Sequence, residues 1–141
     1  MKKERVFVDT NIILDWLGKR APFFQYAEQL FLKAEHKEIE ILISTMSYIS
    51  TEYILRKQLG RDRAKQALMG IRAISSVCSS GKKEIDLALI SDIRDFEDAF
   101  QYFTALTHSA NAIITRNPKD FKSASIPIMS AEEYIKFVQK N

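Results

Sequence analysis

The sequence predicts an α/β fold in which a central, mostly parallel sheet of about four to five strands is covered by helices on both faces. Short apolar runs of strand composition alternate with one or two longer segments of helical periodicity. Only four glycines and three prolines occur, which favours short connections and many helices. The 141 residues are 46% hydrophobic, a size and composition that predict a single domain over residues 1–141 with one core.

The first strand is expected at residues 5–8, where Val6, Phe7 and Val8 form a β-branched and aromatic run. This run stops at Asp9, and Thr10 offers an N-cap for a helix over 11–17. The middle of the chain then predicts helix 22–36, strand 39–43, helices 46–58 and 62–73, and a short apolar segment near 74–78. Helices 83–90 and 95–107, strand 112–115, a short strand near 126–128 and helix 131–139 complete the expected order.

Composition narrows the class of protein. No apolar stretch approaches the roughly 20 residues of a membrane span, and residues 1–5 run into the first strand without a signal-peptide core. The single cysteine, Cys78, excludes an internal disulfide and fits a reducing cytoplasm. We therefore expect a cytoplasmic protein without a membrane partner.

Positive charge is concentrated in residues 53–83. The whole chain carries a formal net charge of +3, but this segment holds eight basic residues and one acid, so it is +7 and the remainder is −4. Such asymmetry points to an anionic partner, nucleic acid before membrane, with a solvated helical face as the alternative. The basic residues are Arg56, Lys57, Arg61, Arg63, Lys65, Arg72, Lys82 and Lys83.

Two acids occur where a purely structural role is not obvious. Asp9 is expected at the hand-over from a strand to a helix, the edge of an open α/β sheet where ligands bind. Glu52 shares a helical face with Tyr48, Leu55 and Leu59. An acid in an apolar stripe is expected to be paired, protonated or metal-bound, and an ion pair with Arg56 at i+4 is the structural alternative.

The helix at 95–107 opens with two further acids, Asp95 and Asp98, three residues apart. Capping already accounts for Asp95, so Asp98 has the better claim to function. Glu97 lies in line with Gln101 and Thr104 and is expected to be solvated. The buried face of the helix is expected to consist of Phe96, Ala99, Phe100, Phe103 and Leu106.

A second strand end delivers polar groups late in the chain, at Thr115, Arg116 and Asn117. Arg116 is expected either to contact phosphate or to form a surface ion pair. Carboxylates from distant segments repel one another at a shared site unless a cation joins them. Oxygen ligands without cysteine or histidine favour Mg²⁺ or Mn²⁺ over zinc, and His36 and His108 have no metal-ligand spacing.

These motifs together resemble the PIN-domain ribonucleases that form the toxin half of bacterial toxin–antitoxin pairs (VapC-like toxins). The resemblance covers essentially the full length, through Val8-Asp9-Thr10-Asn11, Thr51-Glu52-Tyr53, Asp95-Phe96-Glu97-Asp98-Ala99 and Ile114-Thr115-Arg116-Asn117. It implies a three-layer α/β/α sandwich, an acidic pocket for Mg²⁺ or Mn²⁺, and hydrolysis of RNA phosphodiester bonds. It also implies a homodimer and a cognate antitoxin.

Carried over by position, Asp9, Glu52 and Asp98 match the three metal-binding and catalytic acids of the family. Thr10, Asn11 and Thr115 match supporting polar groups, while Asp95 and Asp120 are further candidate ligands. Many relatives have an aspartate where this chain has Asn117, which offers only a neutral carbonyl oxygen, so we expect one metal ion rather than two. The resemblance also implies that RNA phosphates contact basic residues, for which the candidates are Arg56, Lys57, Arg61, Arg63 and Arg116, and that Tyr48, Tyr53 or Tyr102 stacks on a base.

Two other functions fit parts of the pattern. A non-catalytic PIN-like module that binds RNA or protein is compatible with Asn117. A HAD-like phosphohydrolase also uses an aspartate after its first strand, but it needs a second acid two residues later, where this chain has Asn11.

Overall fold

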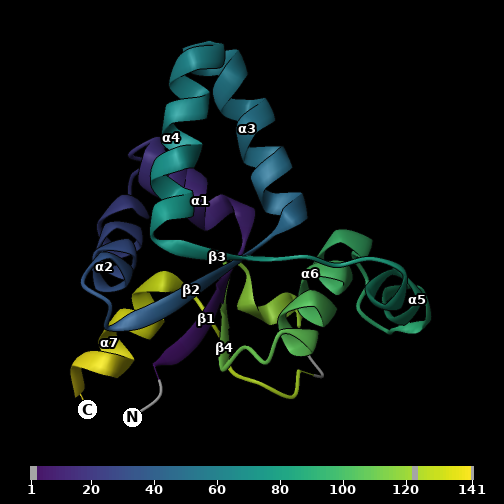
Figure 1. Ribbon diagram of the computed structural model, residues 1–141. Helices are drawn as coiled ribbons and strands as arrows, with labels where there is room; N and C mark the ends of the chain where they lie inside the picture. The colour runs from purple at the N-terminus through teal and green to yellow at the C-terminus, as the bar shows by residue number, and fades with distance from the viewer. Residues whose placement is uncertain (1–2, 122–123, 141) are drawn as a thin grey trace.

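The computed structural model describes residues 3–121 and 124–140. Its five strands are β1 (Glu4–Val8), β2 (Ile39–Ser44), β3 (Ser75–Cys78), β4 (Ala112–Ile114) and β5 (Ile128–Met129), all parallel in the order β3-β2-β1-β4-β5 (Figure 1). The helices are α1 (Thr10–Leu17), α2 (Phe24–Glu35), α3 (Thr45–Leu59), α4 (Arg61–Ala73), α5 (Lys82–Ile90), α6 (Phe96–Thr107) and α7 (Ala131–Lys140), with a 3₁₀ turn at Pro118–Asp120.

The two faces of the sheet build two cores from alternating residues of the same strands. Val6 and Val8 of β1 pack with α1, α2 and α7 on one face, whereas Phe7 between them packs with α6 on the other. Neighbouring strands repeat the pattern: Ile41 and Ile43 share the first face and Leu42 the second. Because both faces are covered, the strands are apolar throughout, as expected of a buried parallel sheet. The predicted α/β/α sandwich is confirmed.

Most element boundaries lie within two residues of those expected from the sequence. The apolar segment near 74–78 is strand β3, and the last strand begins at Ile128 rather than at residue 126. The predicted cap of the first helix is wrong: Thr10 is the first helical residue, and Asp9 is the N-cap. Asp9 has an extended backbone, and its carboxylate accepts from the N–H of Thr10.

The expected buried face of the helix at 95–107 is only partly correct: Ala99 is buried, and Phe103 and Leu106 pack partly buried against the core. Phe96 is 47% exposed because it occupies the first turn of α6, ahead of the residues that pack on the sheet. The most buried side chains beyond Ala99 are Gln101, Tyr102, Thr104 and Ala105, so the helix is rotated by about one residue from the expected orientation.

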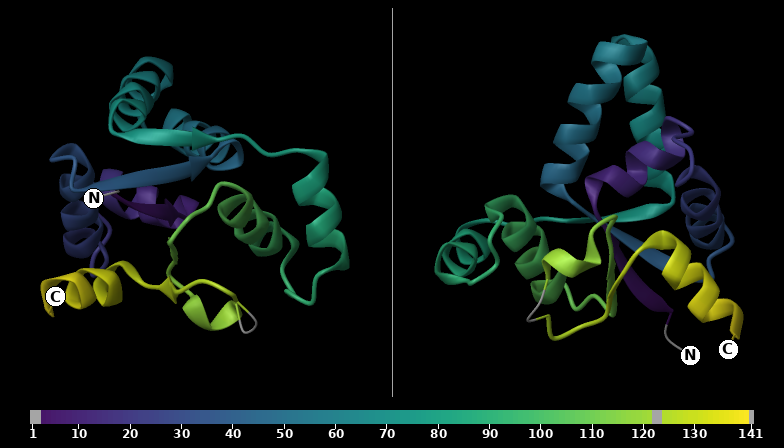
Figure 2. Two further views of the ribbon diagram at one scale, coloured as in Figure 1. Left: turned by 60° about the horizontal axis from the view of Figure 1, so that its bottom comes forward. Right: turned by 180° about the vertical axis from the view of Figure 1, so that it is seen from behind.

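The hairpin of α3 and α4 extends from the body of the molecule at the end of the sheet where α1 and α3 begin (Figure 1). Figure 2 shows the same hairpin from two further directions, together with α5, which packs on α6 at the side of the molecule. Six of the eight basic residues of segment 53–83 therefore lie on this projecting hairpin, whereas Lys82 and Lys83 begin α5. No helix in the part of the chain that the structure describes is long and apolar enough to cross a membrane.

Candidate active site

Asp9 lies at the carboxyl end of the central strand β1, and neighbouring elements hold its carboxylate in place. The N–H of Asp9 donates to the carbonyl oxygen of Ile114, 3.0 Å away in β4. One carboxylate oxygen accepts from the N–H of Thr10 at 2.7 Å, and the other accepts from the Thr115 hydroxyl at 3.2 Å. Asp9 is thus oriented by α1 and by the adjacent strand end, while remaining partly exposed.

Asp98 faces Asp9 from the first turn of α6. Asp95 caps this helix, accepting from the N–H of Asp98 at 2.9 Å, as the sequence predicts. The pKa of Asp98 is raised to about 6, mainly by burial and in addition by the negative charges of Asp95, Asp9, Asp120 and Glu97. These carboxylates therefore share one electrostatic environment, although they come from three distant segments of the chain.

Glu97 belongs to the same environment. Its side chain is exposed, as expected, but its pKa is raised by partial burial and by the charges of Asp9 and Asp95. Glu97 was expected to lie apart from the other acids because it aligns with Gln101 and Thr104. That face of α6 brings the exposed Glu97 within range of the charge of Asp9 and carries the buried Gln101 about one turn later.

A hollow of about 670 Å³ adjoins these acids. Asp95, Asp98 and Asp120 line it, together with Asp92, Ile93, Arg94 and Lys119. The 3₁₀ turn at Pro118–Asp120 places Asp120 in the lining of this hollow, where its charge affects Asp98. Asp120 can therefore take the place of the aspartate that many relatives have at the position of Asn117. Asn117 and Asn11 are exposed.

Glu52 is held in the ion pair that the sequence offered as its structural alternative. Nε of Arg56 lies 3.2 and 3.0 Å from the two carboxylate oxygens, one helical turn along α3. Glu52 is not among the charges that raise the pKa of Asp98. To act with Asp9 and Asp98, it has to exchange Arg56 for another cation.

Arg116 is paired with Asp15, which was not among the site residues predicted from the sequence. The Asp15 side chain is completely buried, and its carboxylate accepts from Nε of Arg116 at 3.0 Å and from the Arg116 Nη2 group. The guanidinium also lies over the ring of Phe23, 4.1 Å from its centroid. The sequence contained a signal for this pair: Asp15 directly follows the apolar run Ile12-Ile13-Leu14, and an unpaired charge in such a buried position is costly.

The other basic candidates lie on the α3–α4 hairpin and are exposed. Lys57 lies over the ring of Tyr53, at 4.5 Å, and Arg56 is paired with Glu52. Arg61 and Arg63 have no ion-pair partner in the described part of the chain. They remain available to an anionic ligand.

Only one of the three tyrosines considered for base stacking is exposed. Tyr53 is 49% exposed. Tyr102 is a core residue whose hydroxyl oxygen accepts from the N–H of Ser125 at 2.8 Å. Tyr48 is half-buried, and its hydroxyl contacts Ser75 at 2.6 Å.

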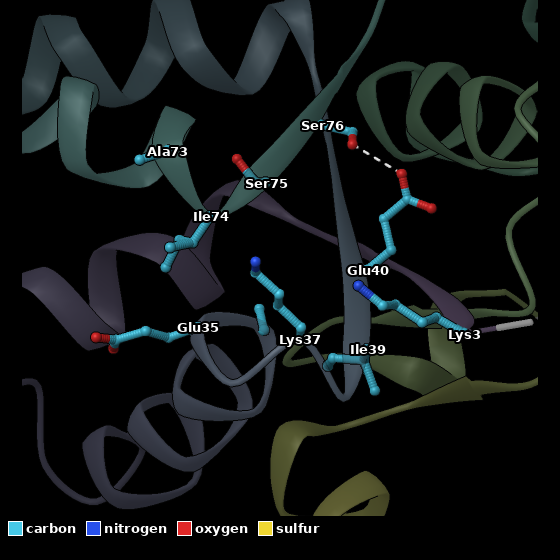
Figure 3. Close-up of a pocket in the computed structure, with 10 residues that line it drawn as sticks. Lys3, Glu35, Lys37, Ile39, Glu40, Ala73, Ile74, Ser75 and Ser76 are labelled. Atoms are coloured by element: carbon cyan, nitrogen blue, oxygen red, sulfur yellow. Dashed lines mark hydrogen bonds between the residues drawn. The ribbon is translucent and has the colours of Figure 1, made fainter.

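A second hollow, of about 450 Å³, lies near the opposite end of the sheet (Figure 3). Within its lining, Glu40 accepts from the Ser76 hydroxyl at 2.8 Å, and Glu40 also accepts from Arg5 at 2.6 Å. Lys3 and Lys37 reach into it from the chain before β1 and the turn before β2. None of the candidate acids lines this hollow, so it is not the candidate site.

The acids around Asp9 fit a hard divalent cation by their chemistry. Asp9, Asp98 and Asp120 offer only oxygen ligands, and none of them is paired with a lysine or arginine in residues 3–121 and 124–140. Their mutual repulsion is the penalty that a bound cation reverses. Within the same residues no three such side chains converge closely enough to ligate one ion, so binding requires side-chain rotation.

The raised pKa of Asp98 predicts a pH-dependent stability difference. Protonation of Asp98 favours the folded state, so its stabilising contribution is complete below the ordinary pKa of 3.8 and is lost as pH rises through about 6. In EDTA, Asp98→Asn should therefore raise the free energy of unfolding relative to the unsubstituted protein at about pH 8, and change it little at about pH 3.5. Urea unfolding at both pH values measures the difference.

Asp86→Asn is the matched control for this measurement, because Asp86 is exposed and paired with Lys82. It should alter stability little at either pH. An equal effect of Asp98→Asn at both pH values would contradict the assigned environment of Asp98.

Comparisons with known proteins agree with this arrangement. Residues 5–119 match a family model described as the PIN domain. The chain is 27% identical over 139 residues to "Ribonuclease VapC1" of Aquifex aeolicus (strain VF5), covering 95% of each. Similar solved structures include a toxin–antitoxin complex from Klebsiella pneumoniae, at a TM-score of 0.68 and 22% identity over 89% of this chain and 97% of that one. Another is the Mycobacterium tuberculosis sarcin–ricin loop cleaving toxin VapC20, with a TM-score of 0.60 and 19% identity. That match covers 77% of this chain and 86% of the other one.

Proposed function

The chain belongs to the PIN domain family, and we propose that it is a metal-dependent endoribonuclease that serves as the toxin of a toxin–antitoxin pair. The observation that carries the proposal is the group of Asp9, Asp98 and Asp120 at the carboxyl end of the parallel sheet. Within this group the charges of Asp9 and Asp120 contribute to the raised pKa of Asp98. The similarity to the Aquifex aeolicus ribonuclease over nearly the full length supports it.

In this proposal Asp9 and Asp98 hold one Mg²⁺ or Mn²⁺ ion. Such an ion, when bound, polarises the scissile phosphate and lowers the pKa of the attacking water. Thr115 keeps the Asp9 carboxylate in position by donating to its second oxygen. Asp120 lines the same hollow as Asp98, and in this proposal it supplies the negative charge that Asn117 lacks.

Glu52 acts in this proposal only after leaving Arg56. Nε of Arg56 holds both of its oxygens in an exposed i,i+4 pair, which is a weak interaction of about 0.3–0.5 kcal/mol. A cation beside Asp9 can therefore compete for Glu52 at small cost. Glu52 would then orient the attacking water.

The α3–α4 hairpin is the proposed contact for the RNA backbone. Arg61 and Arg63 lie exposed at the start of α4, and Tyr53 on α3 offers an exposed ring for stacking on an unpaired base. Arg116 is better explained by its ion pair with the buried Asp15, so the proposal assigns it a structural role.

A protein partner is proposed as well, with a cytoplasmic location in which the single buried Cys78 stays reduced. The Klebsiella pneumoniae relative was solved as a toxin–antitoxin complex. This chain exposes Ile49, Met69 and Val77 around a hollow of about 500 Å³ between α3, α4 and β3. Exposed apolar side chains of this kind support an antitoxin or a second copy of the chain as a partner.

Cleavage of a labelled single-stranded RNA tests the proposed activity. We expect cleavage with millimolar Mg²⁺ or Mn²⁺ and none in EDTA. Binding of the same RNA in EDTA should weaken as salt rises, and Arg61→Gln/Arg63→Gln should reduce the log–log salt slope by about one to two. Lys136→Gln/Lys140→Gln on α7 is the matched control and should leave the slope unchanged.

The outcome of this assay also decides the alternative function. RNA binding without cleavage at any metal concentration would favour the non-catalytic module that Asn117 keeps open. The match to a PIN domain model decides against the HAD-like phosphohydrolase.

A further inference from the structure

Buried polar side chains form a continuous chain of contacts beneath Asp9. The Nε2 group of Gln101 donates to Oγ of Ser47 over 2.8 Å, and this oxygen lies 2.7 Å from Oγ1 of Thr10. The N–H of Thr10 donates in turn to Asp9, over 2.7 Å. Gln101, Ser47 and Thr10 are 3%, 0% and 8% exposed, so this series of contacts lies inside the protein and ends at the partly exposed Asp9.

Each member of this chain belongs to a different element of the candidate site. Thr10 is the first residue of α1, directly after Asp9. Ser47 lies in the first turn of α3, the helix of the second predicted acid. Gln101 lies on α6, one turn after the third predicted acid. The three contacts therefore join the elements on which the candidate acids lie.

The contacts of Ser47 favour one direction for the hydrogen atoms of the two hydroxyl groups. Oγ of Ser47 accepts from Gln101, and its only other side-chain contact within the described residues is Thr10. A buried hydroxyl group directs its hydrogen to an acceptor, so Ser47 donates to Thr10. The Thr10 hydroxyl has no other hydrogen-bond partner within the described residues, so its hydrogen is available to a ligand oxygen.

Gln101 is an unfavourable choice for stability alone. Its Oε1 is buried and has no hydrogen-bond partner in the part of the chain that the structure describes. An unpaired buried acceptor costs about 1–3 kcal/mol, which an apolar side chain of the same shape avoids. Thr104, one turn further along α6 and also buried, instead satisfies its hydroxyl by donating to the Phe100 carbonyl oxygen.

We propose that Gln101 is a positioning residue for the metal and phosphate site, an inference that rests on the proposed nuclease function. Through Ser47, its amide directs the Thr10 hydroxyl hydrogen toward an oxygen atom of the ligand bound beside Asp9. The same contacts set the spacing of α1, α3 and α6, and therefore the approach of their acids to one ion.

Gln101→Met tests this role, because methionine has similar length and lacks the amide. Two quantities are measured: the Mn²⁺ concentration that half-maximally raises the melting temperature without RNA, and the rate of RNA cleavage at each Mn²⁺ concentration. We expect the half-maximal concentration to rise, or the rate to fall, by about 10-fold or more. In EDTA the melting temperature should stay the same or increase.

Thr104→Val is the matched control, since it removes a buried hydroxyl group from the same face of α6 without touching Ser47. It should leave the Mn²⁺ dependence unchanged. Ser47→Ala should reproduce the effect of Gln101→Met, and the two substitutions combined should lose no more than either alone, because both act through one chain of contacts.

Two results would overturn the proposal. One is a Gln101→Met protein that changes only its melting temperature in EDTA while keeping the original Mn²⁺ dependence. The other is fully additive losses in the double variant. If the unsubstituted protein binds Mn²⁺ but cleaves no RNA, the nuclease function fails while the Mn²⁺ measurement still decides the role of Gln101. If it binds no Mn²⁺, both fail.

Discussion

Asp9→Asn should lower the rate of metal-dependent RNA cleavage by about 10³-fold or more. The substitution removes one negative charge from the proposed metal site, where the bound ion contributes several kcal/mol to the transition state, and each 1.36 kcal/mol is a factor of ten. Folding should be preserved, because Asp9 caps α1 through a side-chain oxygen that asparagine also has. Initial rates at saturating Mn²⁺, with melting temperatures for both proteins, make this measurement.

Asp95→Asn is the matched control for Asp9→Asn. Both aspartates are N-caps, and asparagine replaces both equally well as a cap. Because capping already explains Asp95, its substitution should reduce the rate far less. Equal rates for Asp9→Asn and the unsubstituted protein would remove Asp9 from the chemistry.

Asp15→Asn should lower the free energy of unfolding by about 3 kcal/mol. Removing one partner of a buried ion pair typically costs 3–5 kcal/mol, because the remaining charge loses its counter-ion. The lower value is expected here because the Arg116 side chain is 25% exposed, so the guanidinium retains some hydration. Chemical denaturation measures the loss, and the melting temperature should fall by about 6–12 °C.

Two further variants separate this ion pair from a general loss of stability. Glu132→Gln removes one partner of an exposed pair with Lys136 and should cost less than about 0.5 kcal/mol. Asp15→Leu/Arg116→Met replaces both charges with apolar groups and should recover most of the lost stability. A loss for Asp15→Asn no larger than that for Glu132→Gln would contradict the assigned role of the pair.

The positions of Asp9 and Asp98 follow from local signals in the sequence. Asp9 ends a β-branched run, and the carboxyl ends of parallel strands meet at one edge of the sheet. Asp98 follows a capping aspartate by three residues, which places it in the first turn of a helix. Both signals depend only on neighbouring residues, so they can be interpreted without the fold.

Side-chain orientation was harder to predict than position. Glu97 was expected to be solvated on a face that it shares with Gln101 and Thr104; Glu97 is exposed, yet Gln101 is 3% exposed. The rotation of α6 depends on how Tyr102 and Ala105 pack against the sheet, and no local pattern shows which face that packing selects. An error of one residue in the buried face was enough to hide the polar chain from Gln101 to Thr10.

The sequence by itself determined the parallel α/β/α sandwich, the order of its elements and the two acids at its carboxyl edge. Apolar periodicity, capping and turn signals are local, so they act on each element independently. Only the tertiary structure decided that Asp15 pairs with Arg116 and that Gln101 contacts Ser47. It also decided that Glu52 pairs with Arg56 and does not join the acids around Asp98. Apart from the i,i+4 pair, these contacts join residues more than 50 positions apart, and their geometry is set by the packing of whole helices on the sheet.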